Sequence, residues 1–114
     1  MKVKKNYVYE ADVIEAYDGD TVTLDIDLGV DVWLRKHRCR LYRINTPEVR
    51  GTERPHGLIS RNVLREKIVG KKVIIQTYKD KRGSFSRLLV DIWLDGENIN
   101  DWLVSEGLAE YKDY

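Results

Sequence analysis

The side chains of this sequence that could take part in chemistry are mostly carboxylates and arginines rather than cysteines or histidines. Cys39 is the single cysteine, so neither an internal disulfide nor a cysteine metal site can form. The two histidines, His37 and His56, are too few and too far apart in the sequence for a histidine-based metal cage. Any metal ion that binds must therefore be a hard cation held by oxygen ligands.

The chain of 114 residues has a formal net charge of only +1, but its charges are strongly segregated. Residues 35–87 contain 16 lysines and arginines against 4 acidic residues, a surplus of 12 positive charges. The segments before and after this block have net charges of −5 and −6. Such a basic block is a plausible footprint for a polyanion. Charge alone equally allows solvated faces that happen to segregate.

Three short segments combine carboxylates, arginines and turn residues. They are Asp18-Gly19-Asp20-Thr21-Val22, the run from Arg40 to Glu48 (RLYRINTPE), and Phe85-Ser86-Arg87. Taken singly, each is weak, because Asp-Gly-Asp is a common turn and Thr-Pro-Glu is an ordinary start of a helix or loop. Arg40 and Arg87 could also be plain surface charges. All three segments in one chain, in this order and at compatible spacing, form a far more specific pattern than any one of them alone.

The elements that must position these residues can be read from the side-chain pattern. Segments rich in β-branched and aromatic residues are predicted strands over residues 7–17, 21–26, 72–77 and 87–94, and residues 30–44 are predicted as a long strand or a hairpin. Apolar residues at helical spacing predict one helix over 58–69 and a second from about Asn98 to Gly107. Residues 49–57 and 78–86 are predicted loops.

The order of these elements is three strands, a helix, two strands and a helix. A small barrel with a helix inserted after the third strand is typical of the OB-fold. The prediction is therefore one domain over residues 1–114, mainly β with helices (α+β), built as a five-stranded OB-fold barrel with two to three short helices. OB-folds often bind nucleic acid or saccharide, which indicates a class of ligand and says nothing about cleavage.

Over roughly residues 8–110 the chain resembles the staphylococcal nuclease family. The resemblance rests on the three segments above and on the downstream residues Asp95-Gly96, Asn100 and Leu103 to Ala109. It implies an OB-fold nuclease that hydrolyses phosphodiester bonds in DNA and RNA with little sequence preference. The products implied are a 3′-phosphate and a 5′-hydroxyl.

The family's site residues can be carried over onto matching positions. The resemblance implies that Arg40 and Arg87 stabilise the transition state, since a guanidinium fork suits phosphate oxygens. It implies that Glu48 is the general base. It also implies one divalent cation, calcium in the family, with these ligands: the Asp20 carboxylate, the Asn45 side chain and the Thr46 backbone carbonyl.

Further residues in the flanking loops are expected to contact the substrate. Phe85 is the aromatic residue expected to meet a base, and four basic residues are expected at phosphates: Arg50, Arg54, Lys81 and Arg82.

Two positions depart from the family pattern. The family usually carries aspartate where this chain has Asn45, which removes one negative charge and should weaken metal binding. Ser86 replaces the usual glycine before Arg87 and could shift that hairpin. Neither change removes a catalytic side chain.

The sequence therefore predicts a metal-dependent phosphodiesterase acting on single-stranded or frayed DNA and on RNA. The alternative is a non-catalytic OB-fold module that binds nucleic acid through the same basic face, although such a module has no need of Glu48 beside a bound phosphate. We expect a monomer without an obligate protein partner and without a membrane segment. No signal peptide is visible, so a cytoplasmic location is expected if the chain is whole.

Overall fold

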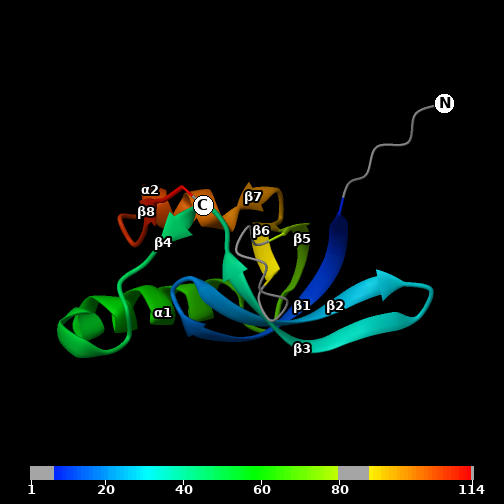
Figure 1. Cartoon of the computed structure of the whole chain (residues 1–114), viewed down its shortest axis with the longest axis horizontal. Helices are drawn as coiled ribbons and strands as arrows, with labels where there is room; N and C mark the ends of the chain where they lie inside the picture. The colour runs from blue at the N-terminus through cyan, green and yellow to red at the C-terminus, as the bar shows by residue number, and fades with distance from the viewer. Residues whose placement is uncertain (1–6, 80–87, 114) are drawn as a thin grey trace.

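The computed structural model of the chain describes residues 7–79 and 88–113, which are predominantly β (Figure 1). The strands are β1 (Val8–Asp18), β2 (Thr21–Gly29), β3 (Val32–Leu41), β4 (Ile44–Asn45), β5 (Lys72–Tyr78), β6 (Leu88–Leu94), β7 (Glu97–Asn98) and β8 (Glu110–Tyr111). The helical segments are the 3-10 turn η1 (Gly51–Glu53), α1 (Arg54–Ile68) and α2 (Ile99–Ser105). Neither α1 nor α2 has the length and apolar character that a bilayer-spanning helix requires.

Five of these strands close into a barrel. β1 pairs antiparallel with both β2 and β5, β2 pairs with β3, and β5 pairs with β6. A short parallel pairing between β3 and β6 joins the two ends of the sheet, from Cys39 beside Leu88 to Leu41 beside Val90. The predicted α+β fold, a five-stranded OB-type barrel with short helices, is confirmed.

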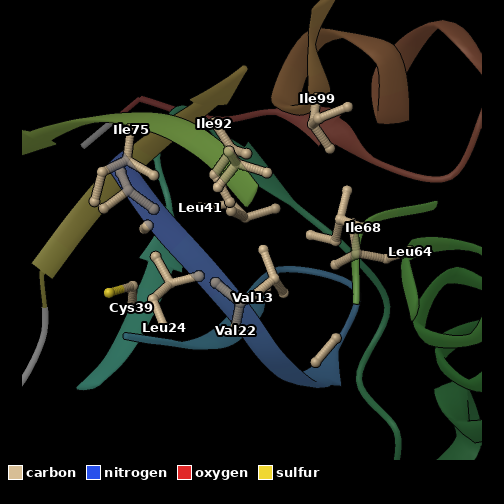
Figure 2. Close-up of a cluster of buried hydrophobic side chains, with 14 of the residues drawn as sticks. Val13, Val22, Leu24, Cys39, Leu41, Leu64, Ile68, Ile75, Ile92 and Ile99 are labelled. Carbon is tan, nitrogen blue, oxygen red and sulfur yellow. The ribbon is translucent and has the colours of Figure 1, made fainter. Parts of the chain in front are cut away.

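The barrel interior is filled by side chains from all five barrel strands. Val22, Leu24 and Ile26 of β2 are at most 1% exposed, as the alternation of a half-buried strand requires. Figure 2 shows Val22 and Leu24 of β2 in one cluster with Leu64 and Ile68 of α1 and Ile99 of α2. Both helices therefore seal the barrel rather than stand apart from it.

Cys39 lies in this core, as its place on β3 predicts. It is fully buried, and burial raises the pKa of its thiol to about 12. The thiol therefore stays protonated and acts as a small apolar side chain.

The prediction of a loop over residues 49–57 was wrong at its C-terminal end, because α1 begins at Arg54. Pro55 and Gly57 are ordinarily helix breakers. In the first turn, however, a proline loses no hydrogen bond, since the first backbone N–H groups have no helical partner. Gly57 lies inside the helix where the Glu48 backbone packs closely against it.

The prediction of a long strand or a hairpin over residues 30–44 was wrong at its C-terminal end, because β4 pairs with β8 and does not continue β3. β3 ends at Leu41, and the chain turns through Tyr42 and Arg43 before the short strand β4. Arg43 has a φ of +69°, a left-handed conformation that costs energy for a non-glycine residue. Sequence periodicity carries no signal for such a turn.

Candidate functional site

The centre of the candidate site is a buried ion pair between two adjacent strands. Arg40 of β3 lies opposite Thr21, the first residue of β2, which places it beside Asp20 in the turn between β1 and β2. Arg40 Nη1 is 3.0 Å from Asp20 Oδ2, and the two side chains are only 11% and 9% exposed. The backbone adds a second link, because Leu41 N–H donates to the Asp20 carbonyl at 2.8 Å. The barrel itself therefore holds this carboxylate against this guanidinium.

Asn45 and Thr46 join this pair from the segment that follows the turn. The Thr46 backbone N–H donates to Asp20 Oδ2 at 2.9 Å. Arg40 Nη2 donates to Asn45 Oδ1 at 3.2 Å, and Arg40 Nη1 donates to the carbonyl of Ile44 at 3.2 Å. One guanidinium thus bridges the side-chain oxygens of Asp20 and Asn45.

The Asp20 carboxyl is unusual in its electrostatics. Burial, together with the nearby Asp18 carboxyl, raises the pKa of Asp20 despite the positive charge of Arg40. Asp18 Oδ1 also accepts a hydrogen bond from the Asp20 backbone N–H at 3.0 Å, which fixes the turn. A buried carboxylate in this environment gains from a further cation.

Gly19 allows the β1–β2 turn to approach Thr46 and α1 closely. A Cβ atom at Gly19 would lie 2.8 Å from the Ser60 Cβ and 2.9 Å from the Thr46 Oγ1. Any larger residue would therefore push Asp20 away from Thr46. The Thr46 Oγ1 itself is buried and has no hydrogen-bond partner among the described residues.

Glu48 has a very different setting from Asp20. It is exposed on the loop before η1, and its Oε2 is 3.7 Å from Arg50 Nε, with the two side chains 67% and 80% exposed. Its backbone N–H donates to Glu53 Oε2 at 3.2 Å, and Arg54 Nη1 donates to the Val49 carbonyl at 2.9 Å. These contacts shape the loop rather than bury the carboxylate.

The backbone of this loop rests directly on α1 at Gly57. A Cβ atom at Gly57 would lie 2.1 Å from the Glu48 carbonyl oxygen and 2.9 Å from the Pro47 carbonyl oxygen. Backbone atoms cannot swing aside as the end of a flexible side chain can. Glycine at position 57 is therefore what allows the helix and the Pro47-Glu48 backbone to touch.

The turn that leads into Asn45 is anchored on its far side by Arg43. Arg43 Nη2 lies 2.7 Å from Asp91 Oδ1, and Asp91 is only 3% exposed. Arg43 Nη1 also bonds Asp101 Oδ1 at 3.1 Å. These bonds hold the left-handed conformation at Arg43, and with it the path of the chain into β4. β4 is then paired with β8, Asn45 opposite Glu110.

A cavity of about 330 Å³ opens beside Asn45 and Thr46. Glu53 and His56 line it from η1 and the start of α1, and residues 107–110 line it from the C-terminal segment. The outer side of the Asn45-Thr46 segment therefore faces open space rather than packed side chains.

The residues expected from the sequence fall into three sets. The first set meets around one guanidinium: Asp20, Arg40, Asn45 and Thr46. The second lies on the loop before α1 or at its first residue: Glu48, Arg50 and Arg54. The third set lies outside the described residues: Lys81, Arg82, Phe85 and Arg87.

Gly57 and Arg43 were not among the expected site residues. Gly57 gives a weak signal, as a glycine after Pro55 near a predicted helix, but its contact depends on tertiary packing. Arg43 stands among several arginines, and nothing in the sequence separates it from them.

The oxygens at the centre of the site fit a hard divalent cation. They are one buried carboxylate and one amide oxygen that face each other across the Arg40 guanidinium, with the Thr46 backbone adjoining. Residues 7–79 and 88–113 contain no group of three or more histidine, cysteine, aspartate or glutamate side chains placed to hold a metal ion. Such a site is poor in charge, which favours weak binding.

The fold and this centre together define the class: an OB-fold protein with a buried aspartate–arginine pair next to a Thr-Pro-Glu loop. Residues 38–114 match the sequence model described as "Staphylococcal nuclease homologue". That match covers about two thirds of the chain. The chain therefore belongs to the staphylococcal nuclease family, and the resemblance predicted from its motifs is confirmed.

Individual relatives agree with this assignment. The chain is 31% identical over 100 residues to a thermonuclease of Staphylococcus intermedius, covering 85% of this chain and 56% of that protein. It is 30% identical over 105 residues to a thermonuclease of Staphylococcus hyicus, covering 90% and 59%. It is also 30% identical over 98 residues to the SPbeta prophage-derived endonuclease YokF of Bacillus subtilis (strain 168), covering 82% and 31%. The chain thus spans less than three fifths of the staphylococcal relatives.

Proposed function

We propose that this chain is a metal-dependent endonuclease that hydrolyses phosphodiester bonds in DNA and RNA with little sequence specificity. The observation that carries the proposal is the position of Arg40, whose guanidinium bridges Asp20 and Asn45 next to the Thr46-Pro47-Glu48 segment. Family membership supports the reaction class, and relatives named thermonuclease and endonuclease share most of this chain's length.

The proposed cation is calcium, with the Asp20 carboxylate, the Asn45 side-chain oxygen and the Thr46 carbonyl as its protein ligands. When bound there, a divalent cation supplies charge neutralisation and orientation for the phosphate. The single carboxylate explains why we expect the affinity to be low. Asn45 keeps a suitable oxygen but contributes no charge.

Arg40 is proposed to stabilise the transition state through its N–H groups. Hydrolysis adds negative charge to the non-bridging phosphate oxygens, and fixed donors aimed at those oxygens lower the barrier. Arg40 now donates to the Asp20 and Asn45 oxygens proposed as metal ligands. If the Asp20 and Asn45 oxygens bind the cation, the N–H groups of Arg40 are released from them and can donate to phosphate oxygens instead. Arg87, outside the described residues, is proposed as the second such arginine.

Glu48 is proposed as the general base. It is exposed to solvent, so water can reach its carboxylate, and an exposed ion pair with Arg50 restrains it only weakly. Glu48 takes a proton from the attacking water, whose oxygen then bonds to phosphorus while the bond to the leaving oxygen breaks. Arg50, Arg54, Lys81, Arg82 and Phe85 are proposed substrate contacts along the flanking loops.

A digestion assay tests the proposal against the alternative of a non-catalytic binding module. Purified protein is incubated with single-stranded DNA and with RNA, with calcium, with EDTA, and with EDTA followed by excess calcium. We expect cleavage of both substrates with calcium, loss with EDTA and recovery on adding calcium back. Binding without cleavage under every metal condition would support the binding module and overturn the proposal.

A further inference from the structure

The outer face of the barrel next to Arg40 carries a second arginine, Arg38. Cys39 and Leu41 of β3 are fully buried, so the alternate residues Arg38 and Arg40 point to the opposite, outer face. Arg38 lies opposite Thr23 of β2, one pleat along from Arg40 opposite Thr21. Residues two apart on a strand are separated by about 6.6 Å. The two arginines thus form a short row that ends at the candidate site.

Arg38 is held in place by an aromatic ring. Its guanidinium carbon lies 4.9 Å from the centre of the Tyr17 ring, and Tyr17, at the end of β1, is 48% exposed. A guanidinium stacked on a ring keeps its N–H edge available for an anion. The stacking therefore orders Arg38 without using its hydrogen-bond donors.

The neighbouring charges leave Arg38 uncompensated. Arg35, further along β3, is 3.1 Å from Asp25, so its charge is already balanced. Glu15, opposite Thr23 on β1, is engaged 3.0 Å from Arg65 of α1. In the described part of the chain, no carboxylate forms an ion pair with Arg38. Arg38 therefore places a positive charge beside Arg40 that no carboxylate of the described residues pairs.

We propose that Tyr17, Thr23 and Arg38 form a binding surface for single-stranded nucleic acid, which takes the nucleotide next to the cleaved bond. This rests on the proposed function, because the surface is continuous with Arg40. Arg38 binds the neighbouring phosphate, the Thr23 hydroxyl can donate to the backbone, and the Tyr17 edge offers apolar contact to sugar or base. The β2–β3 hairpin projects as a long ribbon in Figure 1, so the bound nucleic acid can continue along it beyond Arg38.

Salt-dependent binding isolates this contact from catalysis. Affinity for a labelled oligothymidylate of about 8 nucleotides, within the site size of OB-folds, is measured in EDTA over a range of salt concentrations. We expect Arg38→Gln to weaken binding roughly tenfold, as for a charged hydrogen bond. It should also reduce the slope of log K against log salt by about 0.7, the value for one phosphate contact on a single strand.

A matched control variant makes the result specific. Arg61→Gln removes the same charge from α1, where Arg61 bonds only the adjacent Asn62 among the described residues, and should leave the salt slope near wild type.

The outcomes separate the two proposals. The proposed surface would be contradicted if Arg38→Gln kept the wild-type salt slope and affinity. An equal change in Arg61→Gln, or no binding by the wild-type protein, would also contradict it. Failure of the proposed function would appear elsewhere, as absence of metal-dependent hydrolysis of either substrate by the wild-type protein.

Discussion

The two acidic residues proposed to act in this site lie in opposite environments. Asp20 and its partner Arg40 are 9% and 11% exposed and 3.0 Å apart, with further hydrogen bonds from the backbone of Thr46. Glu48 and its partner Arg50 are 67% and 80% exposed and 3.7 Å apart. The first pair belongs to the barrel, and the second pair belongs to a loop.

This difference separates the tasks of the two halves of the site. A buried pair is strongly destabilising to break, because the remaining charge is left without a partner, whereas an exposed pair contributes under about 1 kcal/mol. The barrel half of the site, made by Asp20 and Arg40, can therefore hold its charges in a fixed place. The loop half leaves its carboxylate accessible to water, and the contact between Gly57 and the Glu48 backbone sets where that carboxylate lies.

The largest effect should come from removing the buried carboxylate. Asp20→Ala removes the buried carboxylate that lies 3.0 Å from the Arg40 guanidinium, so we expect a loss of about 3–5 kcal/mol in the free energy of unfolding, together with loss of cleavage. Urea denaturation measures the first quantity. Asp12→Ala, which breaks the exposed pair with Lys72, is the matched control and should cost under about 1 kcal/mol. Equal stability losses in the two variants would remove the distinction between the buried and exposed pairs.

A change at Gly57 should act on the loop half alone. Alanine is favoured over glycine within a helix by about 0.8–1 kcal/mol, so any loss of stability in Gly57→Ala comes from the clash with the Glu48 backbone and not from helix propensity. The contact with the Glu48 carbonyl oxygen predicts that Gly57→Ala displaces the loop, and a displacement of about 1 Å can cost about 10²-fold in rate. Turnover and thermal stability are measured beside Asn62→Ala, an exposed position on the same helix.

Combining Gly57→Ala with Glu48→Gln shows whether Gly57 acts through Glu48. If it does, the double variant should be no slower than Glu48→Gln alone, because the displaced group is already inactive. Losses that multiply in the double variant would mean that Gly57 affects the site by another route.

The smallest change concerns the charge of the proposed metal site. Asn45→Asp adds a carboxylate where Arg40 now bonds the amide oxygen, and should tighten calcium binding about tenfold, or about 1.4 kcal/mol. Calorimetric titration of both proteins gives the affinities. Equal or weaker binding by a folded Asn45→Asp variant would remove Asn45 from the metal ligands.

Much of the fold could be predicted from the sequence, because strand alternation and helical spacing are local signals. The prediction of a barrel followed from the order of elements, with three strands before the helix that contains Leu64 and Ile68 and two strands after it. The start of α1 could not be predicted in this way, since Pro55 and Gly57 read as breakers without knowledge of the helix start and of the Glu48 backbone. The left-handed turn at Arg43 could not be predicted either, because it is held by Asp91, which lies far along the chain.

The site was predictable in part for a similar reason. Motif resemblance singled out Asp20, Arg40, Asn45 and Thr46, and the structure brings these four together. The motif resemblance could not show that Asp20 is buried while Glu48 is exposed, because burial depends on the closed barrel. The roles of all these residues, including Arg87 beyond the described segments, stay predictions until they are tested.

The central claim, that Glu48 performs chemistry from an exposed loop, is tested most directly by single-turnover cleavage with Glu48→Gln. Wild-type and variant proteins, both in excess over a labelled single-stranded substrate and saturated with calcium, are compared for rate, substrate affinity and unfolding free energy. We expect the cleavage rate to fall by at least about 10²-fold, as for loss of a general base, while affinity and stability stay near wild type. A wild-type cleavage rate in the folded variant would contradict the account.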